Sequence, residues 1–350
     1  DAMNTVLRSR VLAGDAPGMA VLKGPNVTEW AVKGQLASLD DVAKADGWDK
    51  ILPPLVTSIV KYKGSYVAIP VDVHRVDWMW INPTLLAKVG GKPPTSWDEF
   101  NALADKLKAA GITPLAHGGQ SWQDATVFET VVLGIGGPEF YRKTMVEQDL
   151  TALGSDTMKK VFDQMRRMRG YVDPNFAGRD WNLATAMVMN GQAAMQIMGD
   201  WAKGEFLAAN KQAGKDFLCV PTPSAGGYIL NSNSFAFFKV TDKDKNDGRR
   251  KLASLMLSEP VQIAYTRFKG SIPVRLGVPR TGYDECAVRS MNDLETTSTK
   301  KTLVPSMAHE MATSGAMRGA IVDVVTEHFN SSMSSDVAVK QLVAAVKSAR

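Results

Sequence analysis

The pattern of apolar and polar residues along the chain predicts a mixture of helices and short strands. Apolar residues recur at helical spacing from Met3 to Leu12, in the segment that follows Pro53-Pro54, and from Met317 to Phe329. Short apolar runs predict strands at Met19–Leu22 and at Ala193–Met198. Strands and helices in mixed order are typical of an α/β protein.

Other helices carry recognisable boundaries. Ser96-Trp97-Asp98-Glu99 reads as a capping box, in which the serine hydroxyl and the glutamate carboxylate satisfy each other's backbone N–H groups. Gly111 is placed to end that helix. Further helices are predicted at Met158–Met168, at Leu252–Phe268 with a break at Pro260, and at Val337–Val346.

Two segments could carry the chain from one lobe to another. Lys63-Gly64 reads as a hairpin turn into a strand at Tyr66–Val73, and the alternation from Val71 to Ile81 continues it as one long strand. At Leu230–Phe235, polar residues interrupt an apolar strand at its middle. A length of 350 residues favours two lobes, although length alone also permits one large barrel.

Composition narrows the class of protein. Apolar residues make up 45% and charged residues 22% of the chain, as in ordinary globular proteins. No run approaches the roughly 18 apolar residues that a membrane helix needs. The net charge is +5, but the basic clusters at 166–169, 248–251 and 298–301 are short and contain no aromatic residues. We therefore do not expect nucleic-acid binding.

The sequence contains no motif for metal, cofactor or covalent chemistry. Dinucleotide-binding, P-loop, nucleophile-elbow and EF-hand patterns are absent, and the four histidines have no metal-site spacing. Cys219 and Cys286 lie in no Cys-x-x-Cys pair. They could be two buried thiols or one disulfide in an oxidising compartment, and composition does not choose between these. We predict no cofactor and no metal.

Ten polar and aromatic residues at the ends of predicted elements are candidate ligand-binding residues. Aromatic rings pack on the C–H faces of a sugar, and amides, charged groups and imidazoles exchange hydrogen bonds with hydroxyls. This mixture therefore suits a neutral, polyhydroxylated ligand. The candidates are Lys23, His74, Arg75, Gln120, Trp122, Trp201, Asn231, Asn233, Lys269 and His309.

Each candidate also has a purely structural interpretation. Trp201 follows Gly199-Asp200 and could be core filler rather than a binding platform. Lys23 could be a solvated turn lysine, and Lys269 the cation at a helix C-terminus. His309 could cap a helix, and the two asparagines could serve turn geometry.

Several segments in order resemble the periplasmic solute-binding proteins of sugar ABC transporters. The family pattern around a hinge and the following helix is matched by six positions of this sequence: Asn82, Gly90, Pro93, Pro94, Trp97 and Glu99. The stretch NGQAAMQIMGDW resembles a second family motif, and LSEPVQIAYTRFKGSIPVR continues the match. Within the family, LKGP, VDVHR, GGQSWQ and MAHE resemble the glucose- and mannose-binding branch of Gram-negative bacteria.

This resemblance implies a two-lobed fold with a hinge and a central cleft for the ligand. The expected first lobe is 1–73 plus 233–272, and the second is 74–232 plus 273–350. The family's first strand-helix-strand segment has no counterpart in the sequence, which begins at what resembles the next helix.

The resemblance also implies roles for the candidate residues. Trp201 would stack on the sugar, and Lys23 would reach a hydroxyl. Asn231 and Asn233 match the polar positions of the second crossover, while Lys269 and His309 match late family positions. His74, Arg75, Gln120 and Trp122 are included for their location near the hinge and cleft.

The expected function is therefore binding of a monosaccharide, glucose being favoured, and its delivery to a membrane permease. The protein is expected to be a periplasmic monomer that closes by a hinge motion and catalyses no reaction. An exported compartment would make Cys219–Cys286 a disulfide. The rival hypotheses are a glycosidase or transferase with a similar cleft, which would need two suitably spaced carboxylates, and a protein-interaction module.

Overall fold

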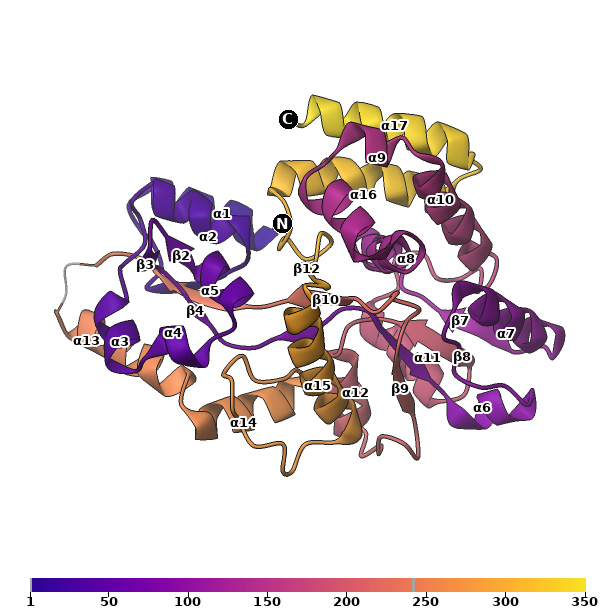
Figure 1. The fold of residues 1–350 in the computed structure, drawn as a ribbon, viewed down its shortest axis with the longest axis horizontal. Coiled ribbons are helices and arrows are strands. Elements are labelled where there is room, and N and C mark those ends of the chain that lie inside the picture. Colours follow the sequence, from indigo (N-terminus) through magenta and orange to yellow (C-terminus); the bar gives the residue numbers. More distant parts are fainter. Residues whose placement is uncertain (1, 241–242) are drawn as a thin grey trace. The chain divides into compact units, whose positions relative to one another are not determined.

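The computed structural model describes residues 2–240 and 243–350, which divide into two compact units (Figure 1). Unit 1 comprises 1–73, 232–267 and 272–279 of the chain, and unit 2 comprises 74–231, 268–271 and 280–350. The predicted lobes differ from these units at Ser232, at 268–271 and at 273–279. The chain passes between units after Val73 and after Asn231, within the two segments predicted as crossovers.

Unit 1 is built on a small antiparallel sheet. Strand β11 (Ser234–Phe237) lies between β1 (Met19–Leu22) and β4 (Ile69–Pro70), and Lys63-Gly64 turns the separate hairpin of β2 and β3. The other elements of this unit are β2 (Lys61–Tyr62), β3 (Ser65–Tyr66), α1 (Ala2–Leu12), α2 (Pro25–Val32), α3 (Asp40–Ala45), α4 (Trp48–Ile51), α5 (Pro54–Val60), α13 (Lys243–Met256) and α14 (Glu259–Lys269), whose last two residues belong to unit 2.

Unit 2 contains two sheets. In the four-stranded sheet the order is β7 (Thr113–Ala116), β8 (Ala193–Ile197), β6 (Trp78–Ile81) and β9 (Leu218–Pro221); only β7 and β8 are parallel. In the three-stranded sheet, β10 (Tyr228–Asn231) lies between β12 (Leu303–Pro305), which is parallel to it, and β5 (His74–Arg75), which is antiparallel.

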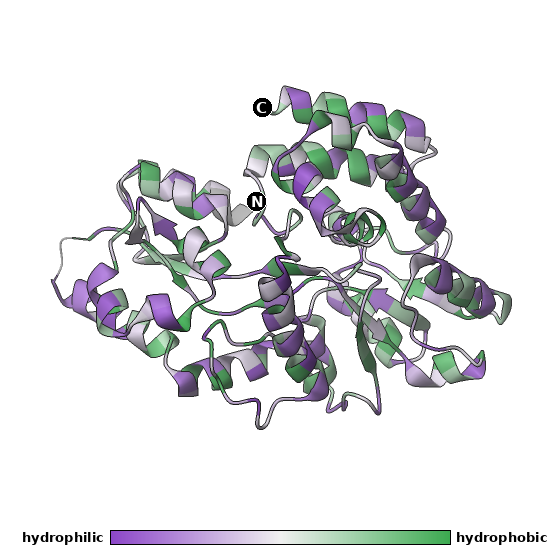
Figure 2. Cartoon of the chain, in the orientation of Figure 1, coloured by the Kyte–Doolittle hydropathy of each residue, from purple (hydrophilic) through white to green (hydrophobic). Residues whose placement is uncertain are grey.

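Helices surround these sheets, and polar and apolar residues are interspersed along α7 (Trp97–Ala109) and α10 (Asp156–Arg169) (Figure 2). Their large apolar side chains are buried, and most of their exposed residues are charged. Helices α8, α10, α16 and α17 pack on one another in a single group (Figure 1). The helices of unit 2 are α6 (Pro83–Lys88), α7 (Trp97–Ala109), α8 (Ser121–Tyr141), the π-turn η1 (Arg142–Val146), α9 (Leu150–Leu153), α10 (Asp156–Arg169), α11 (Trp181–Met189), α12 (Ala202–Ala208), α15 (Glu285–Lys300), α16 (Gly315–Asn330) and α17 (Ser335–Ser348).

The capping box of α7 differs in detail from the prediction. Ser96 Oγ accepts the Glu99 N–H at 3.2 Å, as expected. The Glu99 carboxylate, however, accepts the backbone N–H of Thr95 at 2.8 Å and also the Thr95 hydroxyl. This hydrogen bonding lowers the pKa of Glu99. The Glu99 carboxylate therefore binds the backbone N–H of the residue before the N-cap serine rather than that of the serine itself.

The long strand predicted from Val71 to Ile81 is wrong. The segment forms two short strands, β5 and β6, which belong to different sheets, and β4 ends just before it at Pro70. The prediction failed because the polar residues of the alternation do not face solvent. Asp72, His74, Arg75 and Asp77 are all at most 2% exposed, and each is paired inside the protein.

Candidate functional site

The Gly199-Asp200-Trp201 segment lies between β8 and α12, and Trp201 is the N-cap residue of α12. The indole of Trp201 packs directly over Gly199, where an added Cβ would lie 2.1 Å from Cζ3 of the ring. Glycine is therefore needed for the ring to occupy this position. Trp201 is partly buried, so part of the residue stays exposed.

Trp201 belongs to a group of four rings in unit 2, which we call the aromatic cluster. The ring centroid of Trp201 lies 5.6 Å from that of His74 and 5.0 Å from that of His309. The ring centroid of Trp122 lies 6.0 Å from that of His309. Most of these contacts are edge-to-face, the geometry that aromatic quadrupoles favour. The structure thus brings together rings from β5, from α8 and from the turns after β8 and β12.

Asp200 fixes His74 within the cluster. One carboxylate oxygen lies 2.5 Å from His74 Nδ1, and the other accepts the Arg75 N–H at 3.0 Å. Both side chains are almost fully buried. Burial raises the pKa of Asp200, while the charge and the hydrogen bond of His74 oppose that rise. The pair holds the imidazole in one orientation against Trp201.

Glu129 is a fully buried carboxylate that organises the segment after β12. One oxygen accepts the Ser306 hydroxyl at 2.6 Å. The other accepts the N–H groups of Met307 at 2.7 Å and Ala308 at 3.1 Å, and the Tyr141 hydroxyl at 2.7 Å. Four donors thus replace the water that the carboxylate loses on burial.

This network assigns the tautomer of His309. Because the Ser306 hydroxyl donates its only proton to Glu129, its oxygen must accept from His309 Nδ1–H, 2.9 Å away. In the neutral ring Nε2 is then the hydrogen-bond acceptor. Glu129 Oε1 lies 3.7 Å from Nδ1.

Gln120 positions the fourth ring. Trp122 Nε1–H donates to Gln120 Oε1 at 2.8 Å, and the Gln120 amide donates to Asp180 at 2.7 Å. Gln120 and Trp122 are both only partly buried. Gln120 therefore orients Trp122, while its amide remains near the surface of the unit.

Arg75 points away from these rings and is a buried structural cation. Its guanidinium donates to Asp77 at 3.0 Å and to Asp293 at 2.5 Å. It also lies 4.9 Å from the Trp78 ring and 4.8 Å from the Tyr228 ring. These contacts leave no reason to place Arg75 on a ligand at the aromatic cluster.

Asn231 lies opposite His74 in the register of β10 and β5. It is 3% exposed, and its Oδ1 has no hydrogen-bond partner among the residues that the structure describes. A buried amide oxygen left unsatisfied costs free energy, so this atom is a natural acceptor for a ligand hydroxyl or a water.

The remaining predicted residues lie elsewhere. Lys269 is exposed at the end of α14 and belongs to unit 2. Lys23 and Asn233 belong to unit 1. The Asn233 amide donates to both carboxylate oxygens of Asp72, at 3.1 and 3.0 Å. Their roles in ligand binding stay predictions.

Sequence reasoning missed Glu129 and Ser306. A signal was present for the first, because Glu129 interrupts the apolar run TVFETVVL of a helix, and a charge in such a run must be paired. Ser306 gave no comparable signal. Among residues 2–240 and 243–350, no group of His, Cys, Asp or Glu side chains could hold a metal ion.

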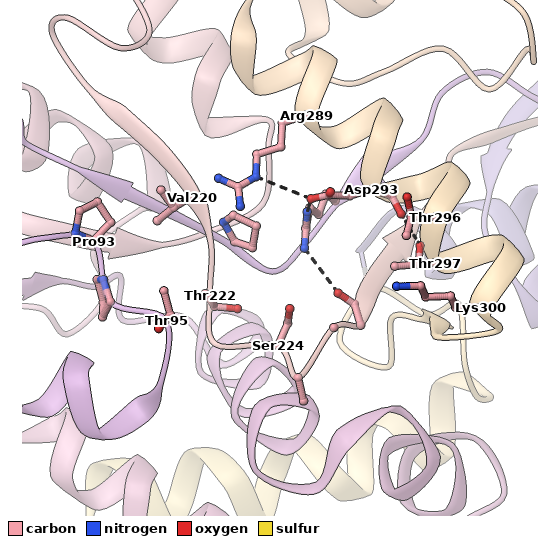
Figure 3. Close-up of a pocket in the computed structure, with 16 residues that line it drawn as sticks. Pro93, Thr95, Val220, Thr222, Ser224, Arg289, Asp293, Thr296, Thr297 and Lys300 are labelled. Atoms are coloured by element: carbon pink, nitrogen blue, oxygen red, sulfur yellow. Dashed lines mark hydrogen bonds and ion pairs between the residues drawn. The ribbon is translucent and has the colours of Figure 1, made fainter.

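Unit 2 also contains a cavity of about 670 Å³ beside α15, which we call the α15 cavity (Figure 3). Arg75 is the one predicted site residue that lines it. The other lining residues are Pro93, Pro94, Thr95, Val220, Pro221, Thr222, Ser224, Ala225, Gly226, Gly227, Arg289, Asp293, Thr296, Thr297 and Lys300.

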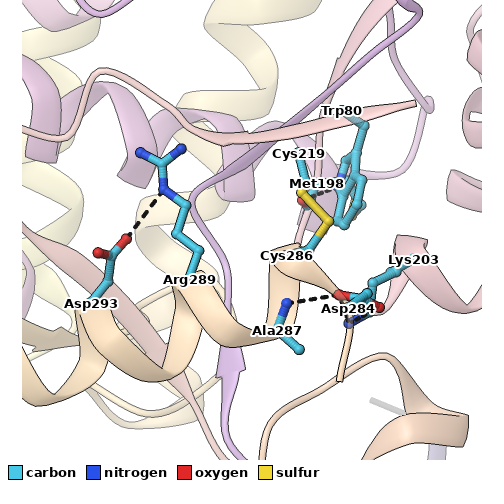
Figure 4. Close-up of a disulfide and its surroundings, with 9 residues drawn as sticks. All are labelled: Trp80, Met198, Lys203, Cys219, Asp284, Cys286, Ala287, Arg289 and Asp293. Atoms are coloured by element: carbon cyan, nitrogen blue, oxygen red, sulfur yellow. Dashed lines mark hydrogen bonds and ion pairs between the residues drawn. A yellow bond between two sulfur atoms is a disulfide. The ribbon is translucent and has the colours of Figure 1, made fainter. Parts of the chain in front are cut away.

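A disulfide between Cys219 and Cys286 joins β9 to the first turn of α15 (Figure 4). The two Cα atoms are 5.9 Å apart, and both side chains are buried near Trp80. In the same first turn, Asp284 accepts the Ala287 N–H and pairs with Lys203 at 3.0 Å. The disulfide implied by the family resemblance is confirmed.

The fold and the site define a class of protein, an α/β binding protein of two units. The sequence model of the bacterial extracellular solute-binding proteins matches residues 1–263. The chain belongs to that family, whose members bind solutes and are not enzymes. No helix among the described residues is long and apolar enough to span a membrane.

Individual relatives agree with the family. A probable sugar-binding periplasmic protein of Brucella suis is 50% identical, over 99% of this chain and 82% of its own length. One from Rhizobium meliloti is 48% identical, over 99% and 83%. These relatives confirm the predicted periplasmic location.

Solved structures agree with the fold. A chitin oligosaccharide binding protein superposes with a TM-score of 0.81 at 21% identity, covering 98% of this chain and 86% of its own. A bacterial solute receptor described as preferring β-D-galactopyranose gives 0.82 at 20%, covering 99% and 88%. Identities this low show the fold alone.

Proposed function

We propose that the protein binds a monosaccharide at the aromatic cluster and delivers it to the permease of an ABC transporter, with glucose as the favoured sugar. The observation that carries the proposal is Trp201, whose ring is held over Gly199 and braced by His74 and His309 while part of the residue stays exposed. A rigid, partly exposed tryptophan suits the apolar C–H face of a sugar ring.

The polar groups around Trp201 suit hydroxyls rather than charges. Asn231 Oδ1 is a buried acceptor with no partner among the described residues, and Asn231 lies in unit 2. The two nearby acids, Asp200 and Glu129, use both their oxygens on protein donors. A neutral ligand therefore meets fixed hydrogen-bonding groups without an unpaired charge.

Names of relatives support sugar as the solute class and an ABC transporter as the partner. The Brucella and Rhizobium proteins are named as sugar-binding, and a Pyrococcus horikoshii protein 31% identical over 93% of this chain is named as an ABC transporter extracellular-binding protein. The choice of glucose among sugars depends on the sequence motifs alone. The structural neighbours do not favour it, since they are described with galactose, maltose or raffinose.

Isothermal titration calorimetry with glucose, mannose, galactose and maltose tests the proposal. We expect one monosaccharide to bind, and Trp201→Ala to weaken it by about 2–4 kcal/mol, the usual loss of a buried aromatic anchor. Gly199→Ala keeps the indole but forces it to move, so it should also weaken binding.

Trp181→Ala is the matched control, since it removes a partly buried indole of unit 2 outside the aromatic cluster. Equal sugar affinity in Trp201→Ala and Trp181→Ala would return Trp201 to a packing role. Absence of binding by every sugar in the wild-type protein would contradict the proposed ligand class.

A further inference from the structure

The α15 cavity lies between a strand edge and one face of a helix. Among the strands of residues 2–240 and 243–350, β9 pairs only with β6, and its residues Val220 and Pro221 line the cavity. On α15, Arg289, Asp293 and Lys300 recur at helical spacing along the lining (Figure 3). The disulfide joins the same strand to the same helix and fixes their separation at one end.

The cavity carries positive charge that the protein does not neutralise. Three cations line it, Arg75, Arg289 and Lys300, and the carboxylates they meet are Asp293 and, behind Arg75, Asp77. Three cations against two carboxylates leave one positive charge in excess.

Arg289 and Lys300 are the cations with spare donors. Arg289 reaches Asp293 only through Nε at 3.8 Å, and Asp293 already accepts from Arg75 at 2.5 Å. No ion pair of Lys300 occurs among the described residues. Partial burial and the neighbouring Arg75 lower the pKa of Arg289, as expected for a guanidinium whose charge is incompletely compensated.

Three threonine hydroxyls of the cavity offer hydrogen-bond acceptors rather than donors. Thr296 and Thr297 donate their protons to carbonyls one turn back along α15, at 2.8 and 2.7 Å. Thr95 donates its proton to Glu99 at 2.8 Å. Each hydroxyl oxygen therefore has only lone pairs left, so it can accept a hydrogen bond from a ligand but cannot donate one.

The wall opposite α15 is rigid. Pro93, Pro94 and Pro221 line it, and they have fixed φ angles and no N–H groups. Next to them, Ser224 O accepts the Gly227 N–H at 2.8 Å across a tight turn in which Ala225 has a φ of 49°. An alanine in this left-handed region is strained, and such strain gathers at binding sites.

We propose that the α15 cavity is a second binding site, for a small hydroxylated anion such as a sugar phosphate or a sugar acid. Arg289 and Lys300 would bind the anionic group, and the threonine oxygens would accept from the ligand hydroxyls. The volume of about 670 Å³ suits a ligand of this size. This site does not depend on sugar binding at the aromatic cluster.

Calorimetry with glucose 6-phosphate, gluconate, inorganic phosphate and glucose tests the proposal on the full chain. Glucose 6-phosphate or gluconate should bind, and more tightly than inorganic phosphate. The double variant Arg289→Gln/Lys300→Gln should lose at least about tenfold in affinity. Trp201→Ala should leave this affinity unchanged, which separates the second site from the first.

Lys340→Gln/Lys347→Gln is the matched control, because it removes two exposed charges of unit 2 on α17, away from the cavity lining. If both double variants lose affinity equally, the effect is net charge and the site is refuted. Failure of all three anions to bind the wild-type protein refutes it as well. Equal affinity for inorganic phosphate and glucose 6-phosphate would remove the role of the hydroxyls.

Discussion

The aromatic cluster and the α15 cavity begin from consecutive residues of one strand, yet they have opposite chemistry. His74 joins the rings around Trp201, and Arg75 lines the cavity, since successive residues of a strand point to opposite faces. The cluster consists of aromatic rings, and the buried carboxylates beside it, Asp200 and Glu129, accept hydrogen bonds from protein donors. The cavity instead has an excess of cations and no aromatic residue in its lining. One strand of two residues thus contributes to both the proposed sugar site and the proposed anion site.

The two faces also differ in what holds them in place. Asp200 and Glu129 accept hydrogen bonds from the groups that carry the rings, so the cluster is fixed by buried polar networks. The cavity is fixed by a covalent bond, by three prolines and by the Arg75–Asp77 pair. This contrast predicts which substitutions affect both faces and which affect one.

The largest effect should come from Arg75→Met. It removes the cation that compensates both Asp77 and Asp293, and Asp77 is 0% exposed. Breaking a buried pair from one side costs about 3–5 kcal/mol of unfolding free energy. Urea denaturation measures the loss, with Arg289→Gln as the exposed control; a loss below about 1 kcal/mol would show that Arg75 is not a buried structural cation.

Removing the disulfide should come next. The bond closes a loop with a sequence separation of 67, for which chain entropy predicts about 4 kcal/mol and typical measurements give 2–4 kcal/mol. Cys219→Ser/Cys286→Ser should lower the urea midpoint by a corresponding amount. It should weaken anion binding at the α15 cavity more than sugar binding at the aromatic cluster; equal losses would contradict separate supports.

Acid should destabilise unit 2 through His328, which is 1% exposed. Burial lowers the pKa of His328 from 6.5 to about 4, so the folded protein binds fewer protons than the unfolded chain between these values. Its stabilising effect is complete above about pH 6.5 and is lost as the pH falls towards 4, by about 3 kcal/mol. Denaturation across this range should show the loss, and His328→Leu should flatten it.

The smallest effect should come from Glu129→Gln. The amide keeps the shape but offers one acceptor in place of two, so a donor among Ser306, Met307 and Tyr141 loses its partner. We expect a loss of about 1–3 kcal/mol of unfolding free energy. Because Glu129 also positions His309 through Ser306, sugar affinity should fall in the same variant, while anion affinity should not; urea denaturation measures the stability and calorimetry the affinities.

Much of the element order was predictable from local patterns. The strand Met19–Leu22 was predicted to the residue, and the helices at Met158–Met168 and Met317–Phe329 lie within α10 and α16. Their apolar spacing and their caps are properties of neighbouring residues, which is why sequence suffices. Trp201 was singled out for a similar reason, because it follows a buried strand.

The partners of the buried charges could not be predicted in this way. Asp77 and Asp293 meet on Arg75 although they are 216 positions apart in the chain, and Glu129 meets Ser306 across 177 positions. Nothing local distinguishes such residues from solvated ones. The error at Val71–Ile81 has the same origin, since its polar residues looked solvated and are in fact paired.

The sequence by itself determined the family, much of the element order and the kinds of side chain available for binding, because these depend on local order and composition. Only the tertiary structure decided that Arg75 faces away from His74, that Glu129 sets the tautomer of His309, and that Cys219 meets Cys286. The physical reason is that burial makes polar groups seek partners wherever the fold brings them, and those partners are distant in the chain.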